Sequence, residues 1–314
     1  MSERVPDAEH ARRTELTRQH AGRGIAAIVV ALFLFASMDV LIKLLQAEGF
    51  SVLQIFFFRS FFALVPIAAV IRAEGGVAAL KTRRLPGHFG RTLLTMGFLL
   101  CFFWALSMLP LASVYSISFA SPLLITALSV PLLGERVGPR RWGAVLVGFA
   151  GILLILRPGG DAFSLGGFVA LASTLFYAFG MILVRQLSRT ESNAAIVFWF
   201  SIFASVLAAL GLPWFWSTPA EWTHWALLVA VGILGGTGQV FITEAYRRAD
   251  AAVVSPFQYT SLLWGLVFGW LVFGEVPGGG VLAGGAIVIA SGLYILHRET
   301  RRGGAAGRGM AGGQ

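Results

Sequence analysis

The stretch "GAVLVGFAGILLILR" (residues 143–157) returns near the other end of the chain as "GGAIVIASGLYILHR" (residues 284–298). Each copy is an apolar run that ends in a cation, and its composition is typical of a helix whose backbone bonds are satisfied inside a membrane. A recurrence of this kind predicts a fold made from two copies of one helical unit.

Further segments of the chain repeat at a similar spacing. They are "VLIKLL" (40–45) with "ILVRQL" (182–187), "ALSMLPLASV" (105–114) with "AYRRADAAVV" (245–254), and "PLLGERVG" (131–138) with "WLVFGEVPG" (270–278). Each unit holds five apolar runs, and an odd number makes the second unit enter the membrane from the opposite face. We therefore expect two inverted five-helix repeats, an arrangement typical of secondary transporters with a solute site between the halves.

The composition indicates a membrane protein. The 314 residues are 57% hydrophobic and 12% charged, with a mean hydropathy of +0.78, whereas a water-soluble domain carries about 25% charged residues. At roughly 20 residues per span, about ten helices fit. The sequence therefore predicts an all-α polytopic membrane protein with ten transmembrane helices. The expected spans are 25–45, 51–71, 88–108, 112–133, 141–157, 165–186, 194–213, 224–246, 251–273 and 278–297.

Lysines and arginines define the predicted orientation. With the N-terminus inside, nearly all of the 24 cations fall in cytoplasmic segments; Arg157 falls outside, and Lys43 and Arg59 lie within spans. Because positive residues resist translocation, we expect both termini in the cytoplasm and the protein in the inner membrane. The predicted domains are a disordered basic tail (1–24), a first repeat (25–157), a second repeat (165–298) and a Gly/Arg-rich tail (299–314).

Several partners and chemistries are not expected. The formal charge of +9 follows the membrane orientation, so it does not indicate nucleic-acid binding. The single cysteine excludes an intrachain disulfide, and the five scattered histidines lack metal-ligand spacing. No phosphate-binding loop occurs in the sequence. We expect no cofactor and no metal; the expected partners are the lipid bilayer, a small solute and, as an open alternative, protons, with the oligomeric state left open.

Several motifs of this sequence belong together. They are Lys43 at the end of the first run, "FFRS" (57–60), "ALSMLPLASV", "FASPLLITALSVPLLGERVGPRRWGAVLVGFAGILLI" (119–155) and "YTSLLWGLVFGWLVFGEV" (259–276). With these motifs the chain resembles the drug/metabolite transporter superfamily, in its bacterial ten-helix type with two EamA units, over residues 25–298. The resemblance implies transport of small organic metabolites such as amino acids and their derivatives.

Arg59 gives the sharpest signal of function, because it lies near the middle of the second apolar run. A mid-membrane arginine costs between about 2.5 and more than 10 kcal/mol, so it should face protein or water. We expect it to bind a carboxylate of the solute; a structural pairing with an acid such as Asp39 is the open alternative. Asp39 and Lys43 are four residues apart, which predicts a neutralising pair. Alternatively, Lys43 extends to the outer surface and Asp39 binds and releases a proton during transport.

Polar residues near two Ser-Pro steps complete the predicted solute site. Proline frees backbone carbonyls, which a membrane helix tolerates against protein or a water-filled cavity. The steps contain Pro122 and Pro256, to which we assign a gating role. The side chains expected to contact the solute, with helix packing as the open alternative, are Tyr115, Ser118, Gln239, Gln258, Tyr259 and Trp264.

Three glutamates are assigned structural or gating roles. Glu244 precedes Arg247 and Arg248 by three and four residues, which predicts a local ion pair. Glu135 and Glu275 end their apolar runs on opposite faces, where we expect them to organise loops. Close helix packing is predicted at "GILGG" (232–236), "GLVFG" (265–269) and "GVLAG" (280–284).

These features predict a secondary transporter that moves a small organic metabolite by alternating access. We expect export of an amino acid or an amino-acid-derived solute, such as an opine-type metal chelator; the alternative is import of a flavin or an S-adenosylmethionine-like solute. An intramembrane lipid-modifying enzyme is disfavoured, because no acids, histidines or metal ligands with telling spacing converge near an interface. A structural or sensory subunit is disfavoured because it does not need two interchangeable states.

Overall fold

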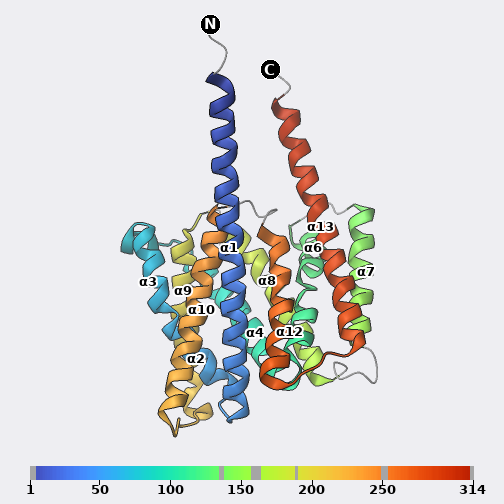
Figure 1. Cartoon of the computed structure of the whole chain (residues 1–314). Coiled ribbons are helices and arrows are strands. Elements are labelled where there is room, and N and C mark those ends of the chain that lie inside the picture. Colours follow the sequence, from blue (N-terminus) through green and yellow to red (C-terminus); the bar gives the residue numbers. More distant parts are fainter. Residues whose placement is uncertain (1–4, 134–137, 157–163, 188–189, 249–253, 312–314) are drawn as a thin grey trace.

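The computed structural model describes residues 5–133, 138–156, 164–187, 190–248 and 254–311. Over these residues the chain is helical and contains no strand. The helices form a bundle, and the two ends of the chain lie at the same end of it (Figure 1). We call this end of the bundle the terminal end and the opposite end the far end.

The apolar runs form helices in the expected order. Among the described residues, seven helices are long and apolar enough to cross a membrane, and α7 and α13 contain shorter apolar helices at 142–155 and 279–295. The chain is therefore a multi-pass membrane protein. The elements are α1 (Val5–Ala47), α2 (Val52–Phe62), α3 (Leu64–Ala73), η1 (Gly76–Leu80), α4 (Leu85–Met108), α5 (Leu111–Ser118), α6 (Ser121–Leu133), α7 (Pro139–Ile155), α8 (Leu165–Leu187), α9 (Asn193–Phe215), α10 (Trp222–Arg248), η2 (Ser255–Tyr259), α12 (Thr260–Phe273) and α13 (Gly279–Ala311).

The terminal helices are longer than the expected spans. The candidate span in α1 covers residues 22–47, and the apolar part of α13 covers residues 279–295. Both helices continue into the segments that the sequence assigns to the tails.

Prolines determine where three of the helices begin or bend. Pro66 has no N–H to bond the carbonyl four residues earlier, and the chain bends at Ala63, between α2 and α3. Pro122 and Pro256 lie in the first turns of α6 and η2, where the missing N–H breaks no internal helix bond. For Pro122 this differs from the expectation of a gap inside a helix, because Phe119 and Ala120 form a turn between α5 and α6.

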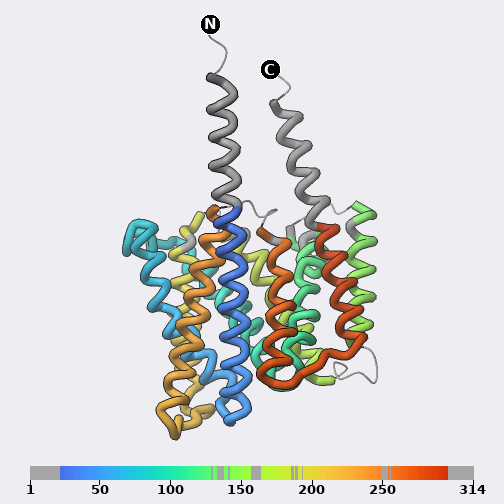
Figure 2. The backbone as a smooth tube through the Cα atoms, viewed as in Figure 1, coloured from blue at the N-terminus to red at the C-terminus, as the bar shows by residue number. Residues whose placement is uncertain are grey.

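Helices from the two halves of the sequence pack against one another. α1 packs on α10, α4 on α8, α2 on α9 and α10, and α7 on α13 (Figure 2). The two repeated segments that contain α7 and α13 thus pack against each other. They meet at Gly151 and Gly284, where a Cβ on Gly284 would come within 2.5 Å of the Gly151 carbonyl oxygen. Only a residue without a side chain allows this crossing.

Two further glycine motifs pack as predicted. Gly232 and Gly236 of α10 lie against the α2–α3 bend, where a Cβ on Gly236 would come within 2.8 Å of the Ala63 carbonyl oxygen. Gly265 of α12 lies against the ring of Tyr115 in α5. The small residues therefore hold α10 and α12 close to helices of the first half, around the space described next.

Candidate functional site

A cavity of about 600 Å³ lies inside the bundle, between helices of the two halves. Its wall is formed by α1, α2, α3, α4, α5, α6, α8, α9, α10, η2 and α12. It includes Val184, Ile196 and Arg247, which lie near the ends of α8, α9 and α10. From there it reaches inward to Asp39 and Arg59. Its volume falls within the usual range for small-molecule sites.

Asp39 and Tyr115 meet in the inner part of this cavity. The Tyr115 hydroxyl donates a hydrogen bond of 2.6 Å to Oδ2 of Asp39. The carboxylate is buried, with 3% of its residue surface exposed, and its Oδ1 has no partner among the described residues. Gly265 leaves room for the tyrosine ring, which also stacks on Phe102 with a centroid distance of 6.1 Å. The arrangement holds one carboxylate oxygen ready to accept a hydrogen bond from a solute.

Arg59 lies one turn before the bend at Ala63, in the wall formed by α2. It is 9% exposed, and its buried Nε has no hydrogen-bond partner among the described residues. No salt bridge joins Arg59 to a carboxylate among the described residues, and Asp39 interacts with it electrostatically at longer range. Gly235 of α10 lies beside its side chain, and a Cβ there would come within 2.8 Å of Sδ of Met38. Within the described part of the chain, Arg59 is thus a buried cation without a salt bridge, and Asp39 is the acid that acts on it.

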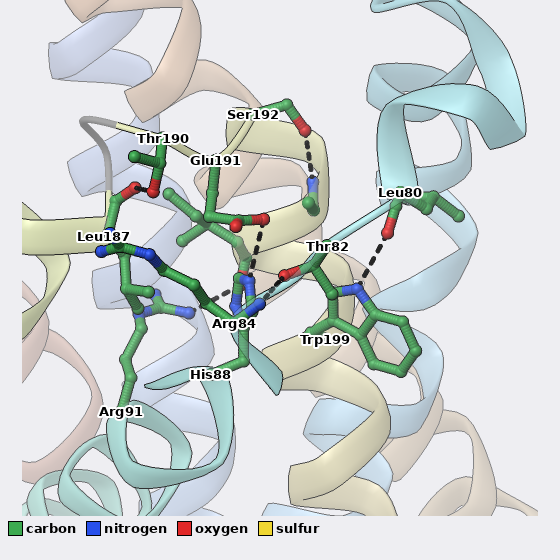
Figure 3. A network of polar contacts seen from close by, with 12 residues as sticks. Leu80, Thr82, Arg84, His88, Arg91, Leu187, Thr190, Glu191, Ser192 and Trp199 are labelled. Carbon is green, nitrogen blue, oxygen red and sulfur yellow. Dashed lines mark hydrogen bonds and ion pairs between the residues drawn. The ribbon is translucent and has the colours of Figure 1, made fainter. Parts of the chain in front are cut away.

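A second cation, Arg91, forms part of the cavity wall on α4. Its Nη1 donates a 2.7 Å hydrogen bond to the Ile196 carbonyl, and its guanidinium lies 5.3 Å from the centroid of the Phe200 ring. Figure 3 shows Arg91 beside the network in which His88 contacts Glu191 at 3.4 Å. This network joins the start of α4 to the α8–α9 connection.

The same network also includes the segment that precedes α4. Trp199 donates to the Leu80 carbonyl at 3.0 Å, and Ser192 donates to the Ala79 carbonyl at 2.6 Å. These bonds attach η1 to α9 and to its N-cap, and Figure 3 shows the bond from Trp199 to Leu80. They hold the part of the wall that carries Arg91 in place.

The structure brings together most of the side chains proposed for the solute site. Gln258 donates a hydrogen bond to the Tyr246 hydroxyl, and Ser118 donates one of 2.9 Å to the Val114 carbonyl. The predicted residues that line the cavity are Asp39, Arg59, Tyr115, Ser118, Gln239 and Gln258.

Two of the proposed aromatic residues lie outside the cavity wall. Tyr259 packs against Phe119 with a centroid distance of 5.0 Å, and its hydroxyl lies over Gly292. Trp264 packs edge-on against Phe33 at 5.1 Å. Neither ring is among the residues that line the cavity. For these two side chains the contacts therefore support helix packing, the alternative to solute contact.

The four-residue spacing predicted that Lys43 pairs with Asp39, but Lys43 finds a different partner. It forms an ion pair of 2.5 Å with Glu275, which follows α12, and donates to the Leu109 carbonyl at 2.8 Å. Glu275 in turn accepts a 3.0 Å hydrogen bond from the Leu111 amide. We call this group the far-end clamp, because it joins α1, the α4–α5 junction and the α12–α13 connection at the far end of the bundle (Figure 1). These contacts are of the kind that the predicted loop-organising role of Glu275 requires.

The remaining assigned residues lie away from the cavity wall. Glu244 pairs with Arg248 at 2.5 Å and with Arg247 at 3.9 Å, which confirms the local ion pair. Pro122 and Pro256 are not among the lining residues. Glu135 lies outside the described residues.

Several polar lining residues were not predicted. Arg91 was counted among the cytoplasmic cations, although it lies on α4 beyond the first turn. Its place inside the predicted span 88–108 was the signal that could have found it. The other missed polar residues are Thr95, Ser121, Thr174, Ser201, Thr243, Tyr246, Arg247 and Ser261.

The bundle and its cavity define a polytopic helical membrane protein with an internal chamber of solute size. The EamA-like transporter family matches residues 22–157 and again residues 164–297. The chain belongs to this family. Because its relatives are transporters, the enzyme alternative is set aside.

Several curated proteins are similar over most of their length. The pseudopaline exporter CntI of Pseudomonas aeruginosa (strain UCBPP-PA14) is 31% identical, over 89% of this chain and 97% of the exporter. A riboflavin transporter of Vibrio cholerae is 33% identical, over 76% of this chain and 81% of the length of that transporter. An S-adenosylmethionine uptake transporter of Rickettsia bellii is 27% identical, over 88% of this chain and 94% of the length of that transporter. A solved crystal structure shares the fold, with a TM-score of 0.60 at 22% identity over 90% of this chain and 97% of the other.

Proposed function

We propose that this protein is a secondary transporter that exports an amino acid or an amino-acid-derived carboxylate across the inner membrane by alternating access. The observation that carries the proposal is the pair of buried, unpartnered polar groups in one cavity, Oδ1 of Asp39 and Nε of Arg59. A carboxylate fits a guanidinium through paired charge-assisted hydrogen bonds, and an ammonium group fits the free carboxylate oxygen. The solute class is therefore a zwitterion with an apolar or ring portion against the aromatic wall.

We further propose ten spans arranged as two inverted five-helix units, at 25–157 and 165–298, between basic terminal segments at 1–24 and 299–314. Two observations support this topology. The family matches the chain twice, in segments that nearly coincide with the two units. Both chain ends also lie at one end of the bundle, as an even number of spans requires (Figure 1). The Lys/Arg distribution assigns that end to the cytoplasm.

Cysteine labelling tests this orientation in intact cells. In a Cys101→Ser background, Ala78→Cys lies on an exposed part of η1 and Thr218→Cys on the exposed α9–α10 connection. A membrane-impermeant maleimide is expected to label Thr218→Cys at once, and Ala78→Cys only after the cells are permeabilised. Labelling of both positions, or of Ala78→Cys alone, in intact cells would contradict the proposed topology.

The conformation fits one half of a transport cycle. The cavity extends to the terminal-side ends of α8, α9 and α10, whereas the far-end clamp joins α1 to the α12–α13 connection. Further bonds support the far end: Gln46 donates to the Phe103 carbonyl at 2.7 Å, and Gln54 exchanges two hydrogen bonds with Ser217. We assign this conformation to the inward-facing state. Asp39 could couple a proton to the cycle, because its free oxygen faces the same chamber as the solute.

A second candidate solute class follows from the aromatic lining. Phe98, Phe102 and Tyr177 face the cavity, and rings of this kind also stack on planar ring systems. This observation favours a flavin or an S-adenosylmethionine-like molecule. Two of the relatives reported above are named as transporters of riboflavin and of S-adenosylmethionine.

Flux measurements in proteoliposomes decide between these candidates. The purified protein is reconstituted with a labelled panel: L-phenylalanine, L-2-aminoadipate, riboflavin and S-adenosylmethionine. We expect protein-dependent flux of at least one amino-acid member and none of riboflavin. Flux of riboflavin or S-adenosylmethionine alone would establish the second candidate, and no protein-dependent flux of any member would overturn the proposed function.

A further inference from the structure

Arg91 is the one guanidinium in the described cavity wall, apart from Arg59, that has no carboxylate partner. The third cation of the wall, Arg247, already faces Glu244. Arg91 makes one side-chain hydrogen bond among the described residues, to the Ile196 carbonyl, although a guanidinium carries five N–H donors. Its Nε is fully buried and has no hydrogen-bond partner in the part of the chain that the structure describes. Donors therefore remain for an anion inside the chamber.

The position of Arg91 is fixed by its neighbours and not by a counter-ion. The bond to Ile196 and the ring of Phe200 hold the guanidinium between α4 and α9. A cation over an aromatic face is stabilised but keeps its charge, so it still attracts an acid. A partly buried cation with a buried Nε, spare donors and a locked position has the properties of a pre-organised anion site.

The two cations lie at different depths in the chamber. Arg59 shares the inner part with Asp39, whose partner Tyr115 stacks on Phe102 of α4. From Phe102 back to Arg91, α4 extends about 16 Å at 1.5 Å per residue. Between them, Thr95 and Phe98 face the cavity from the same helix. The chamber therefore has a cation near each end and an amphiphilic wall between them.

The charge balance of the lining favours more than one acidic group in the solute. Arg59, Arg91 and Arg247 face the cavity, and Asp39 is the acid among the lining residues described. A solute with one carboxylate and one amine would neutralise Arg59 and Asp39 and leave the partly buried Arg91 without a counter-ion, which is costly. A second, distant acid on the solute would remove this cost.

We propose that Arg91 forms a second anion subsite, so that the transported solute is an elongated amino diacid: its amine at Asp39, one carboxylate at Arg59 and a distal acid at Arg91. This inference rests on the proposed function and specifies its solute class. Short diacids such as L-glutamate cannot reach both cations, because several turns of α4 separate the two levels. The apolar middle of the solute lies along Phe98.

Matched probes of equal length test the subsite directly. L-2-aminosebacate and L-2-aminodecanoate differ only in the terminal group, which is a carboxylate in the first and a methyl in the second. With purified protein in nanodiscs, we expect the diacid to bind on the order of tenfold tighter than the monoacid, the gain from one hydrogen-bonded charge pair. L-glutamate should show no such advantage over L-norvaline, its methyl-terminated counterpart of equal length.

Variants assign that advantage to Arg91. Arg91→Gln is expected to bring the ratio of the two Kd values close to one and to change the Kd of the monoacid less than about twofold, while Arg91→Lys keeps part of the ratio. Arg247→Gln is the matched control, because it removes a cavity cation that already has a partner, and it should leave the ratio unchanged.

Two outcomes would overturn the inference. Equal Kd values for the two probes in the wild-type protein would do so without any variant, as would a ratio that survives in Arg91→Gln. Binding of the monoacid with no gain from the second carboxylate would leave the proposed function standing. The flux panel, which contains one-carboxylate solutes, tests that function separately.

Discussion

Replacing Arg59 with glutamine is expected to abolish transport while leaving the protein as stable as the wild type, or more so. Arg59 is buried and has no salt-bridge partner among the described residues, so its charge costs free energy in the empty protein. Loss of the charge removes that cost together with the charge-assisted bond to a solute carboxylate. Such a bond is worth about 1.5–3 kcal/mol, so solute affinity should fall by at least about tenfold.

The measurement combines flux in proteoliposomes with the melting temperature in the same detergent. A structural arginine would show the opposite pattern, with a lower melting temperature and transport reduced in proportion to the folded fraction. Arg59→Lys is the matched control: it keeps the charge but loses the two-pronged geometry, so it should retain intermediate affinity. Unchanged uptake and efflux in Arg59→Gln would remove this residue from the mechanism.

The helix order and the depth of the key residues could be predicted from the sequence, because both depend on apolar run length. Arg59, for example, lies inside α2 and lines the cavity, as a mid-membrane cation should. The local ion pair of Glu244 was also predictable, since three- and four-residue spacing on a helix fixes neighbours without tertiary information.

Rotation about the helix axis and partners distant in sequence could not be predicted in the same way. Asp39 and Lys43 share a helix face, yet each finds a stronger partner elsewhere: Tyr115 for the acid and Glu275 for the base. Trp264 follows η2, whose 3₁₀ turns rotate side chains differently from an α-helix, and its ring packs on Phe33. Arg91 lies inside the predicted span 88–108 but was missed because it stands near the start of that span, where cations were counted as cytoplasmic.

The far-end clamp gives the second large effect that we expect. Lys43 and Glu275 have 16% exposed side chains, and together they satisfy the Leu109 carbonyl and the Leu111 amide. If the cavity opens toward the far end during transport, all of these contacts must separate. The clamp therefore stabilises the conformation described here relative to a far-open one, and weakening it should shift the population toward that second state.

Glu275→Gln is expected to raise the far-side accessibility of the cavity by roughly tenfold, since it leaves Lys43 half-buried without its counter-charge. The readout is the rate at which an impermeant maleimide, added to intact cells, labels Ser118→Cys in a Cys101→Ser background. The charge-swapped pair Lys43→Glu with Glu275→Lys is the control, and it should restore slow labelling if the two charges act on each other.

The single variants Lys43→Glu and Glu275→Lys form a thermodynamic cycle with this double variant. A coupling free energy near zero in the cycle would contradict the clamp, because two independent residues contribute additively. Equal labelling rates in the wild type and Glu275→Gln would mean that some other contact, such as the bonds between Gln54 and Ser217, closes the far end.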